Sequence, residues 1–175
     1  KIWLIWITGN SFRGGLVLYL HEYLLDEGHK LGLDIREKKL HSNSEALCKG
    51  RKIALNSRVL KTSVQKRCYL SEEIWHAKTT VGNITDIRNI NNLKQERFAR
   101  KCSFNDLVPP DKIVQGLLNY CLNLQDICEY LHVTENYFCE AIDYYKQKHG
   151  LYYRCKDYTL YFEPLSVIGS SKGVI

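Results

Sequence analysis

The chain has 175 residues, a length that suits one folded domain. Hydrophobic residues make up 45% of it and charged residues 25%, which excludes the disordered and collagen-like classes. The formal net charge is +6, but the 25 Lys and Arg residues are spread along the whole length. This scatter is typical of a solvated surface and argues against direct binding of nucleic acid.

The N-terminal segment, residues 1–16, is expected to lie outside the folded domain. The chain contains no methionine, and the run Arg-Gly-Gly at residues 13–15 can be encoded by a purine-rich ribosome-binding stretch. We therefore expect translated upstream sequence or a disordered segment; the alternative is an apolar N-terminal strand. The apolar run at residues 2–7 is much shorter than the roughly 20 residues of a membrane span, so we expect no membrane association.

A helix and two strands are predicted next. Leucines recur at helical spacing over residues 18–31, and Gly32 follows as a typical helix stop. Residues 34–40 and 46–55 carry apolar side chains between charged ones and are separated by the turn-rich residues 41–44. We expect these two segments to be strands paired antiparallel.

Two longer helices follow. Apolar residues recur at roughly helical spacing over residues 59–78, where Thr62 or Ser63 is available as the N-cap. After a less regular segment, another helix is predicted from about residue 91 to 104. The pair Pro109-Pro110 then ends this unit, since proline cannot continue a helix.

The C-terminal part is predicted to contain three shorter helices. Asp111 is expected to cap the first, which ends near Leu118. The other two cover residues 124–131 and 134–149, with Thr134 as the N-cap of the last. Their spacing resembles a helix-turn-helix, but the last helix begins with acids and aromatics instead of the basic and amide side chains that read DNA.

A C-terminal hairpin is predicted from residues 151–155 and 158–162, and residues 166–175 are expected to form a frayed tail. The seven cysteines are odd in number, with no C-x-x-C pair and no regular spacing, so they do not predict a disulfide framework. We expect reduced thiols in a cytoplasmic protein.

The side chains that suggest chemistry are Glu72, Glu73 and His76. Glu72 and His76 stand four residues apart, so both project from one face of a helix and can bind one ion. Glu73 occupies the place where zinc peptidases have the carboxylate that accepts a proton from the attacking water. Glu96, on the next long helix, is our candidate for a third ligand. On its own this pattern is weak, because Glu–His pairs at this spacing are commonly ordinary surface pairs.

A longer resemblance makes the pattern more specific. The motif is followed by Lys78-Thr-Thr-Val-Gly-Asn-Ile-Thr-Asp86 and by Lys94-Gln-Glu-Arg-Phe-Ala-Arg100. In this order the segments resemble the ImmA/IrrE family of metallo-endopeptidases, in particular its phage-encoded branch. There the active helix commonly reads Ala-Glu-Glu-Leu-Gly-His, followed by Thr-Thr-Val-Gly-Asp-Ile and later by Lys-x-Glu-x-x-Ala-Arg. Shorter matches extend the resemblance over residues 22–165.

The resemblance implies an α+β fold: a mostly helical, zincin-like (gluzincin-like) domain with a small antiparallel sheet and a C-terminal hairpin. Residues 17–108 would form the metallopeptidase-like core, and residues 109–165 a helical part of the same domain. It further implies zinc bound by His76 and Glu96, with Glu73 as the general base. The protein would be an endopeptidase of a prophage or mobile element, and its substrate a helix-turn-helix repressor.

Two positions depart from the family pattern. Glu72 stands where members with established peptidase character have His, and Trp75 stands where the family usually has Gly. Zinc accepts a Glu oxygen at about 2.0 to 2.2 Å, so Glu72 remains a candidate ligand, and a site with two carboxylates also suits another divalent ion. The alternative function is a catalytically inactive module that keeps the peptidase fold and binds a repressor or another protein.

Overall fold

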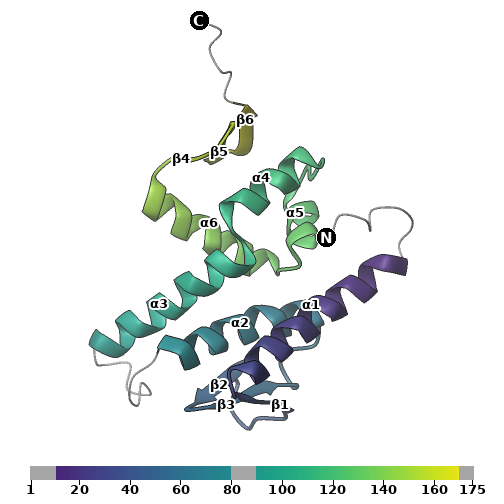
Figure 1. Ribbon diagram of the computed structural model, residues 1–175, viewed down its shortest axis with the longest axis vertical. Coiled ribbons are helices and arrows are strands. Elements are labelled where there is room, and N and C mark those ends of the chain that lie inside the picture. The colour runs from purple at the N-terminus through teal and green to yellow at the C-terminus, as the bar shows by residue number, and fades with distance from the viewer. Residues whose placement is uncertain (1–10, 80–89, 170–175) are drawn as a thin grey trace, which may run out of the picture.

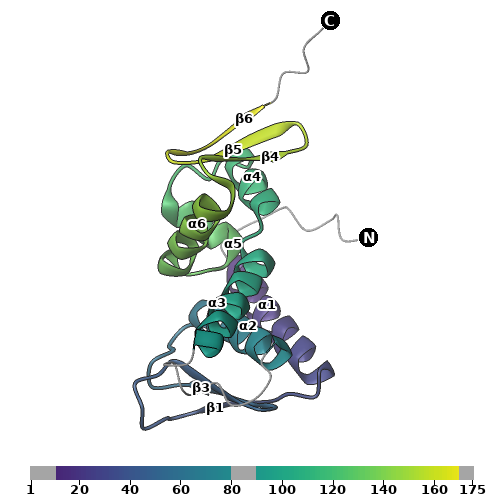
Figure 2. The same cartoon turned by 90° about the vertical axis from the view of Figure 1, so that its left-hand side faces the viewer.

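The computed structural model describes residues 11–79 and 90–169 and has an α+β architecture (Figure 1), which confirms the predicted class. Within these two ranges the elements in chain order are α1 (Ser11–Lys30), β1 (Asp34–Lys38), β2 (Ala46–Lys49), β3 (Lys52–Asn56), α2 (Ser63–Thr79), α3 (Ile90–Leu107), α4 (Pro110–Leu118), α5 (Leu124–Leu131), α6 (Glu135–His149), β4 (Tyr152–Cys155), β5 (Tyr158–Phe162) and β6 (Leu165–Gly169). Two three-stranded sheets lie at opposite ends of the molecule, with the helices between them (Figure 2).

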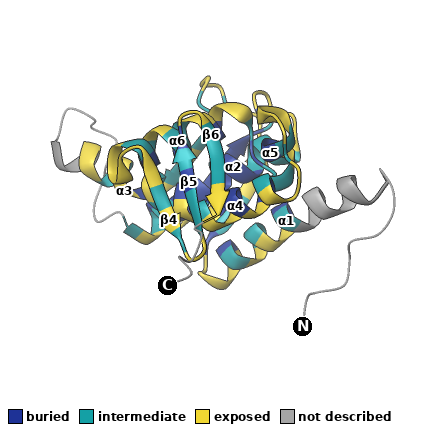
Figure 3. Ribbon diagram, turned by 90° about the horizontal axis from the view of Figure 1, so that it is seen from above, coloured by how far each residue is buried: buried dark blue, intermediate teal, exposed yellow. Residues whose placement is uncertain are grey.

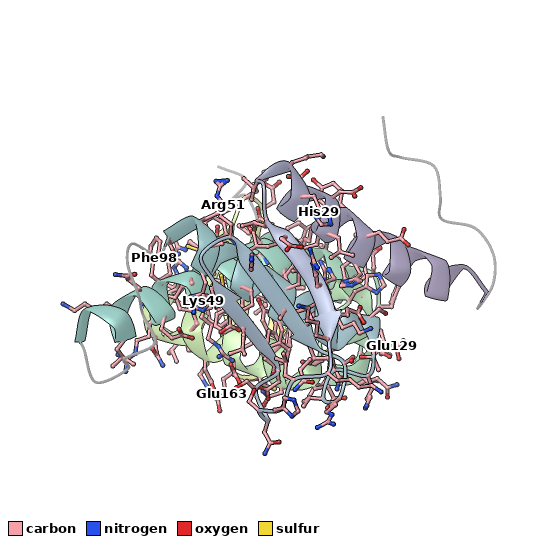
Figure 4. The ribbon with its side chains drawn as sticks, turned by 90° about the horizontal axis from the view of Figure 1, so that it is seen from below. His29, Lys49, Arg51, Phe98, Glu129 and Glu163 are labelled. Atoms are coloured by element: carbon pink, nitrogen blue, oxygen red, sulfur yellow. The ribbon has the colours of Figure 1, made fainter. Side chains whose placement is uncertain are left out.

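The N-terminal sheet has the strand order β1-β3-β2 and is covered on one face by helices (Figure 4). Ile53 and Leu55 alternate along β3 and are both buried, as expected for a strand with one covered face. They belong to one hydrophobic cluster with Leu70 and Ile74 of α2. This packing orients α2, because it turns one side of the helix towards the sheet and leaves the other side for α3.

The predicted antiparallel pairing of residues 34–40 with 46–55 is wrong. β1 pairs with β3 in parallel, and residues 46–55 form a hairpin in which β2 is antiparallel to β3. The chain reverses at Gly50, whose φ of +59° is a left-handed conformation that glycine adopts without steric cost. An alternation of apolar and charged residues looks the same in one long strand and in a hairpin, and only the central glycine distinguishes them.

The C-terminal sheet β4-β5-β6 is antiparallel throughout and lies over α4 and α6 (Figure 3). β4 and β5 confirm the predicted hairpin. The predicted frayed tail is wrong for residues 166–169, which belong to β6; residues 170–175 lie outside the described part. Leu165 and Val167 of β6 pack against the C-terminal hydrophobic cluster, and a frayed tail would expose them.

Hydrogen bonds and proline geometry at the first turn explain where α2, α6 and α4 begin. Thr62 Oγ1 accepts the backbone N–H of Gln65, and Gln65 Oε1 accepts the backbone N–H of Thr62, so the two residues form a capping box at the start of α2. The prediction that Thr134 caps α6 is also confirmed. Asp111 is not a cap, because α4 begins one residue earlier at Pro110, whose fixed φ suits the first helical position.

Helix α1 begins at Ser11, earlier than the predicted start at residue 18, and so includes residues 11–16 of the segment expected to lie outside the domain. Residues 1–10 of that segment are outside the described ranges, as are residues 80–89 between α2 and α3. Among the residues that the structure describes, no helix combines the length and the apolar content needed to cross a bilayer.

Candidate metal centre

Helix α2 presents its polar side to α3, and the two helices lie side by side (Figure 1). Small, fully buried residues form the contact: Ser71 on α2 and Ala99 and Ser103 on α3. Such side chains allow two helices to approach closely. Ser103 Oγ donates to Ser71 Oγ at 2.9 Å and also bonds the hydroxyl of Tyr137 on α6. This buried chain of hydroxyls fixes the register of the helices that carry the candidate ligands.

The three predicted metal ligands come together between these helices. Glu72 and His76 lie one turn apart on α2, and Glu96 faces them from α3; one ligand atom of each lies within 4.8 Å of the others. His76 Nε2 and Glu96 Oε1 are 3.4 Å apart, which matches the roughly 3.4 Å between two ligands of one tetrahedral zinc. A shift of at most roughly 1.4 Å would bring all three atoms to that spacing, so this cluster can hold a metal ion.

His76 is buried in a negatively charged environment. Burial lowers the pKa of His76, but the hydrogen bond to Glu96 and the charges of Glu96, Glu73 and Glu72 outweigh this effect and raise the pKa. The same hydrogen bond lowers the pKa of Glu96. His76 Nδ1 is buried and has no hydrogen-bond partner among the described residues. An unpaired buried polar atom costs about 1 to 3 kcal/mol.

Glu73 is half-buried beside the cluster. Burial raises the pKa of Glu73 to about 7; the charge of His76 opposes this rise, and the charges of Glu72 and Glu96 add to it. A carboxyl group with a pKa near neutral pH can both accept and return a proton under ordinary conditions. The position of Glu73 and its protonation behaviour both suit a general base.

Arg100, one turn after Glu96 on α3, is the main residue of the site that the sequence interpretation missed. Its Nη1 donates to Glu72 Oε1 at 3.3 Å, and its Nη2 donates to Glu140 on α6. Asn136 Nδ2 donates to the second oxygen of Glu140 at 2.8 Å. Burial raises the pKa of Glu72, and the charge of Arg100 opposes that rise. The i, i+4 spacing from Glu96 was the only signal for this role in the sequence.

Trp75, the second departure from the family pattern, is held against α3. Its indole Nε1 donates to Asp106 Oδ2 at 2.6 Å, and Lys78 Nζ lies 4.4 Å from the centre of a Trp75 ring. The indole therefore packs along the helix pair with its polar atom satisfied, as buried or half-buried tryptophans usually do.

Comparisons of the chain with models of protein families, with curated proteins and with solved structures find no match. The resemblance to the ImmA/IrrE family therefore rests on the segments quoted above, of which residues 80–86 lie outside the described ranges. What the structure adds is the side-chain geometry of Glu72, Glu73, His76 and Glu96.

Proposed function

We propose that the chain is a metal-dependent endopeptidase. The observation that carries the proposal is the convergence of Glu72, His76 and Glu96 beside Glu73, a carboxyl group whose pKa is raised to about 7. In peptidases with an H-E-x-x-H helix, two ligands stand four residues apart and the general base follows the first of them. Glu72, Glu73 and His76 have the same spacing, with Glu in place of the first His.

The donor set of one imidazole and two carboxylates suits zinc and, because it is rich in oxygen, also another divalent ion. The negative charges of Glu72, Glu73 and Glu96 around His76 also favour a cation at this place. An ion held there would supply a Lewis acid for a peptide carbonyl and would lower the pKa of a water bound to it.

The residues of the chain have separate roles in this proposal. Glu73 accepts a proton from the attacking water and returns it to the leaving amine, for which a pKa near 7 is well suited. Arg100 holds one oxygen of Glu72 and so orients its carboxylate. The side chain of Glu96 is 46% exposed, so the cluster is in contact with solvent on the α3 side.

The finer assignments belong to the same proposal. The fold would be zincin-like, with α2 as the active helix under the N-terminal sheet. The protein would act in the cytoplasm, on behalf of a prophage or mobile element. Its substrate would be a protein, namely a helix-turn-helix repressor. These points are supported by the resemblance of residues 22–165 to the ImmA/IrrE family.

One observation favours the alternative, a module that binds a protein partner without cleaving it. Arg100 already supplies a positive charge to Glu72. A carboxylate paired with a guanidinium does not need a metal ion to offset the cost of its burial. If this ion pair persists at all times, His76 and Glu96 are left with too few protein ligands for a catalytic zinc site, which usually has three.

Metal content separates the two functions. The purified chain, after incubation with zinc and removal of the excess, is compared by mass spectrometry with Glu73→Gln, His76→Ala and His41→Ala. We expect near-stoichiometric zinc in the unaltered chain and in Glu73→Gln, and its loss in His76→Ala. His41 is exposed and lies outside the cluster, so His41→Ala is the matched control.

Hydrolysis of a peptide substrate gives the second readout. Because Glu73 is the proposed base and not a ligand, Glu73→Gln should keep the metal and lose activity by about 100-fold or more. An unaltered chain that binds no metal under these conditions contradicts the peptidase proposal and supports the binding module.

A further inference from the structure

The C-terminal helices carry a charge opposite to that of the rest of the chain. The 33 residues from 113 to 145 contain no Lys or Arg and five acidic residues. These are Asp126, Glu129, Glu135, Glu140 and Asp143. Because the whole chain carries +6 and this stretch carries −5, the remaining residues carry +11. Residues 110–149, which span α4 to α6, add Asp111 and three lysines to this stretch and carry −3, so negative charge is concentrated in this part of a protein that is basic overall.

An apolar groove lies on the same part of the molecule, between the end of α4, the start of α5, α6 and β6. Leu122 and Leu124 line one side of it, and Phe138 and Ile142 of α6 line another. Its volume is about 370 Å³, within the range of roughly 300 to 1,000 Å³ found for binding sites in proteins.

The connection between α4 and α5 adds exposed apolar side chains beside this groove. Leu118, Tyr120, Leu122 and Leu124 are all exposed, and Tyr120 and Leu122 are 84% and 86% accessible to solvent. Tyr120 also has a left-handed backbone conformation, with φ at +64°, which costs a non-glycine residue about 1 kcal/mol or more. Packing among the described residues does not explain why these side chains are exposed. Concentrated exposed apolar surface of this kind marks interaction sites.

Acidic side chains border the groove. Asp143 lines it, and its side chain is 68% exposed. Glu135 is exposed and lies on the same face of α6, two turns earlier. Asp126 stands in the first turn of α5, next to the lining residues. Lys146 lies on this face too, but it contacts both Asp143 and Glu163, so a second acid shares its charge.

We propose that this groove binds an amphipathic, basic helix of another protein. Leucine-sized side chains of the partner would enter the groove, and its Lys or Arg side chains would lie over Asp143 and Glu135. Charge decides between the possible occupants. A symmetric dimer through the groove would bring two acidic borders together, and nucleic acid would be repelled. The groove contains none of the candidate metal ligands, so this inference goes beyond the proposed function and does not depend on it.

The test is a binding titration of the full chain with a fluorescent peptide that has leucines on one helical face and lysines on the other. A scrambled peptide of the same composition is its control, and EDTA is present so that the metal centre plays no part. Leu122→Ser and Asp143→Lys should each weaken binding by about tenfold. The matched controls, Leu151→Ser and Glu22→Lys, change exposed residues outside the groove and should leave the affinity unchanged.

Leu122 and Asp143 are both exposed, so thermal melting should show that their variants remain folded. Equal binding of the scrambled peptide, or an unchanged affinity in both groove variants, overturns the proposal. Sedimentation provides the remaining outcome: a dimer of the unaltered chain that Leu122→Ser dissociates would assign the groove to a second copy and also overturn it. None of these results bears on zinc content, so the two proposals fail separately.

Discussion

Arg100 determines the charge balance of the candidate site. Two carboxylates, Glu72 on α2 and Glu140 on α6, accept hydrogen bonds from its guanidinium. The side chain of Glu72 is only 9% exposed, so it depends on this partner more than a surface carboxylate would. The arginine therefore connects the helix pair that carries the ligands to the C-terminal half of the molecule.

Replacing Arg100 by Gln should lower the free energy of unfolding by about 1 to 2 kcal/mol, because it leaves a buried carboxylate without its cation; the value is moderate since Arg100 is partly exposed to solvent. Urea unfolding at neutral pH measures the change. Arg97→Gln is the matched control, because Arg97 is exposed on the same helix. In the double variant with Glu72→Gln the loss should be smaller than the sum of the two single losses. Additive losses would show that the two side chains do not interact.

At the scale of one element, helix α2 shows which structural features a local sequence pattern can predict. Helical periodicity predicts α2, and the i, i+4 spacing of Glu72 and His76 correctly predicts that they share a face. The meeting of Arg100 with Glu72, by contrast, depends on how α2 and α3 are packed, and no local pattern contains that information. The hairpin at Gly50 and the third C-terminal strand were missed for a related reason, since short strands are defined by their partners.

The capping box at the start of α2 gives a prediction at this scale. Thr62→Ala removes the side-chain bond to the N–H of Gln65 and should destabilise the protein by about 1 kcal/mol. Thermal unfolding measures the change. Ser63, the other cap candidate from the sequence, lies inside the helix, so Ser63→Ala is the matched control and should cost little. A larger loss in Ser63→Ala than in Thr62→Ala would contradict the observed helix start.

At the scale of the whole molecule, α2 belongs to both halves. Leu70 and Ile74 pack in the N-terminal hydrophobic cluster, whereas Cys68 packs in the C-terminal one. Arg67 strengthens the connection, because its Nη1 donates to the carbonyl oxygens of Leu131 and His132 at the end of α5. The two halves are therefore expected to unfold together, as the prediction of a single domain requires.

The stability of the whole molecule should depend on alkaline pH through Tyr137. This residue forms a hydrogen bond with Ser103 where α3 meets α6. Burial raises the pKa of Tyr137 well above its usual value near 10, and burial also raises the pKa of Cys68 to about 11. In the unfolded chain both groups lose their protons at lower pH, so the unfolded state then binds fewer protons than the folded one. The free energy of unfolding should therefore stay constant up to about pH 8 and then fall, first through Cys68 and above about pH 9 also through Tyr137, by up to about 1.4 kcal/mol per pH unit for each group.

Urea titrations between pH 7 and 11 test this expectation. Tyr137→Phe should be less stable than the unaltered chain at pH 7, because Ser103 loses a partner, yet its stability should fall less steeply above pH 10. Tyr120→Phe, at an exposed position, is the matched control and should leave both the stability and the slope unchanged. If Tyr137→Phe and the unaltered chain lose stability in parallel, Tyr137 is not protected in the folded state. The contact between α3 and α6 would then be looser than its buried hydrogen bond implies, and Arg100 would be the stronger connection between the candidate site and the C-terminal half.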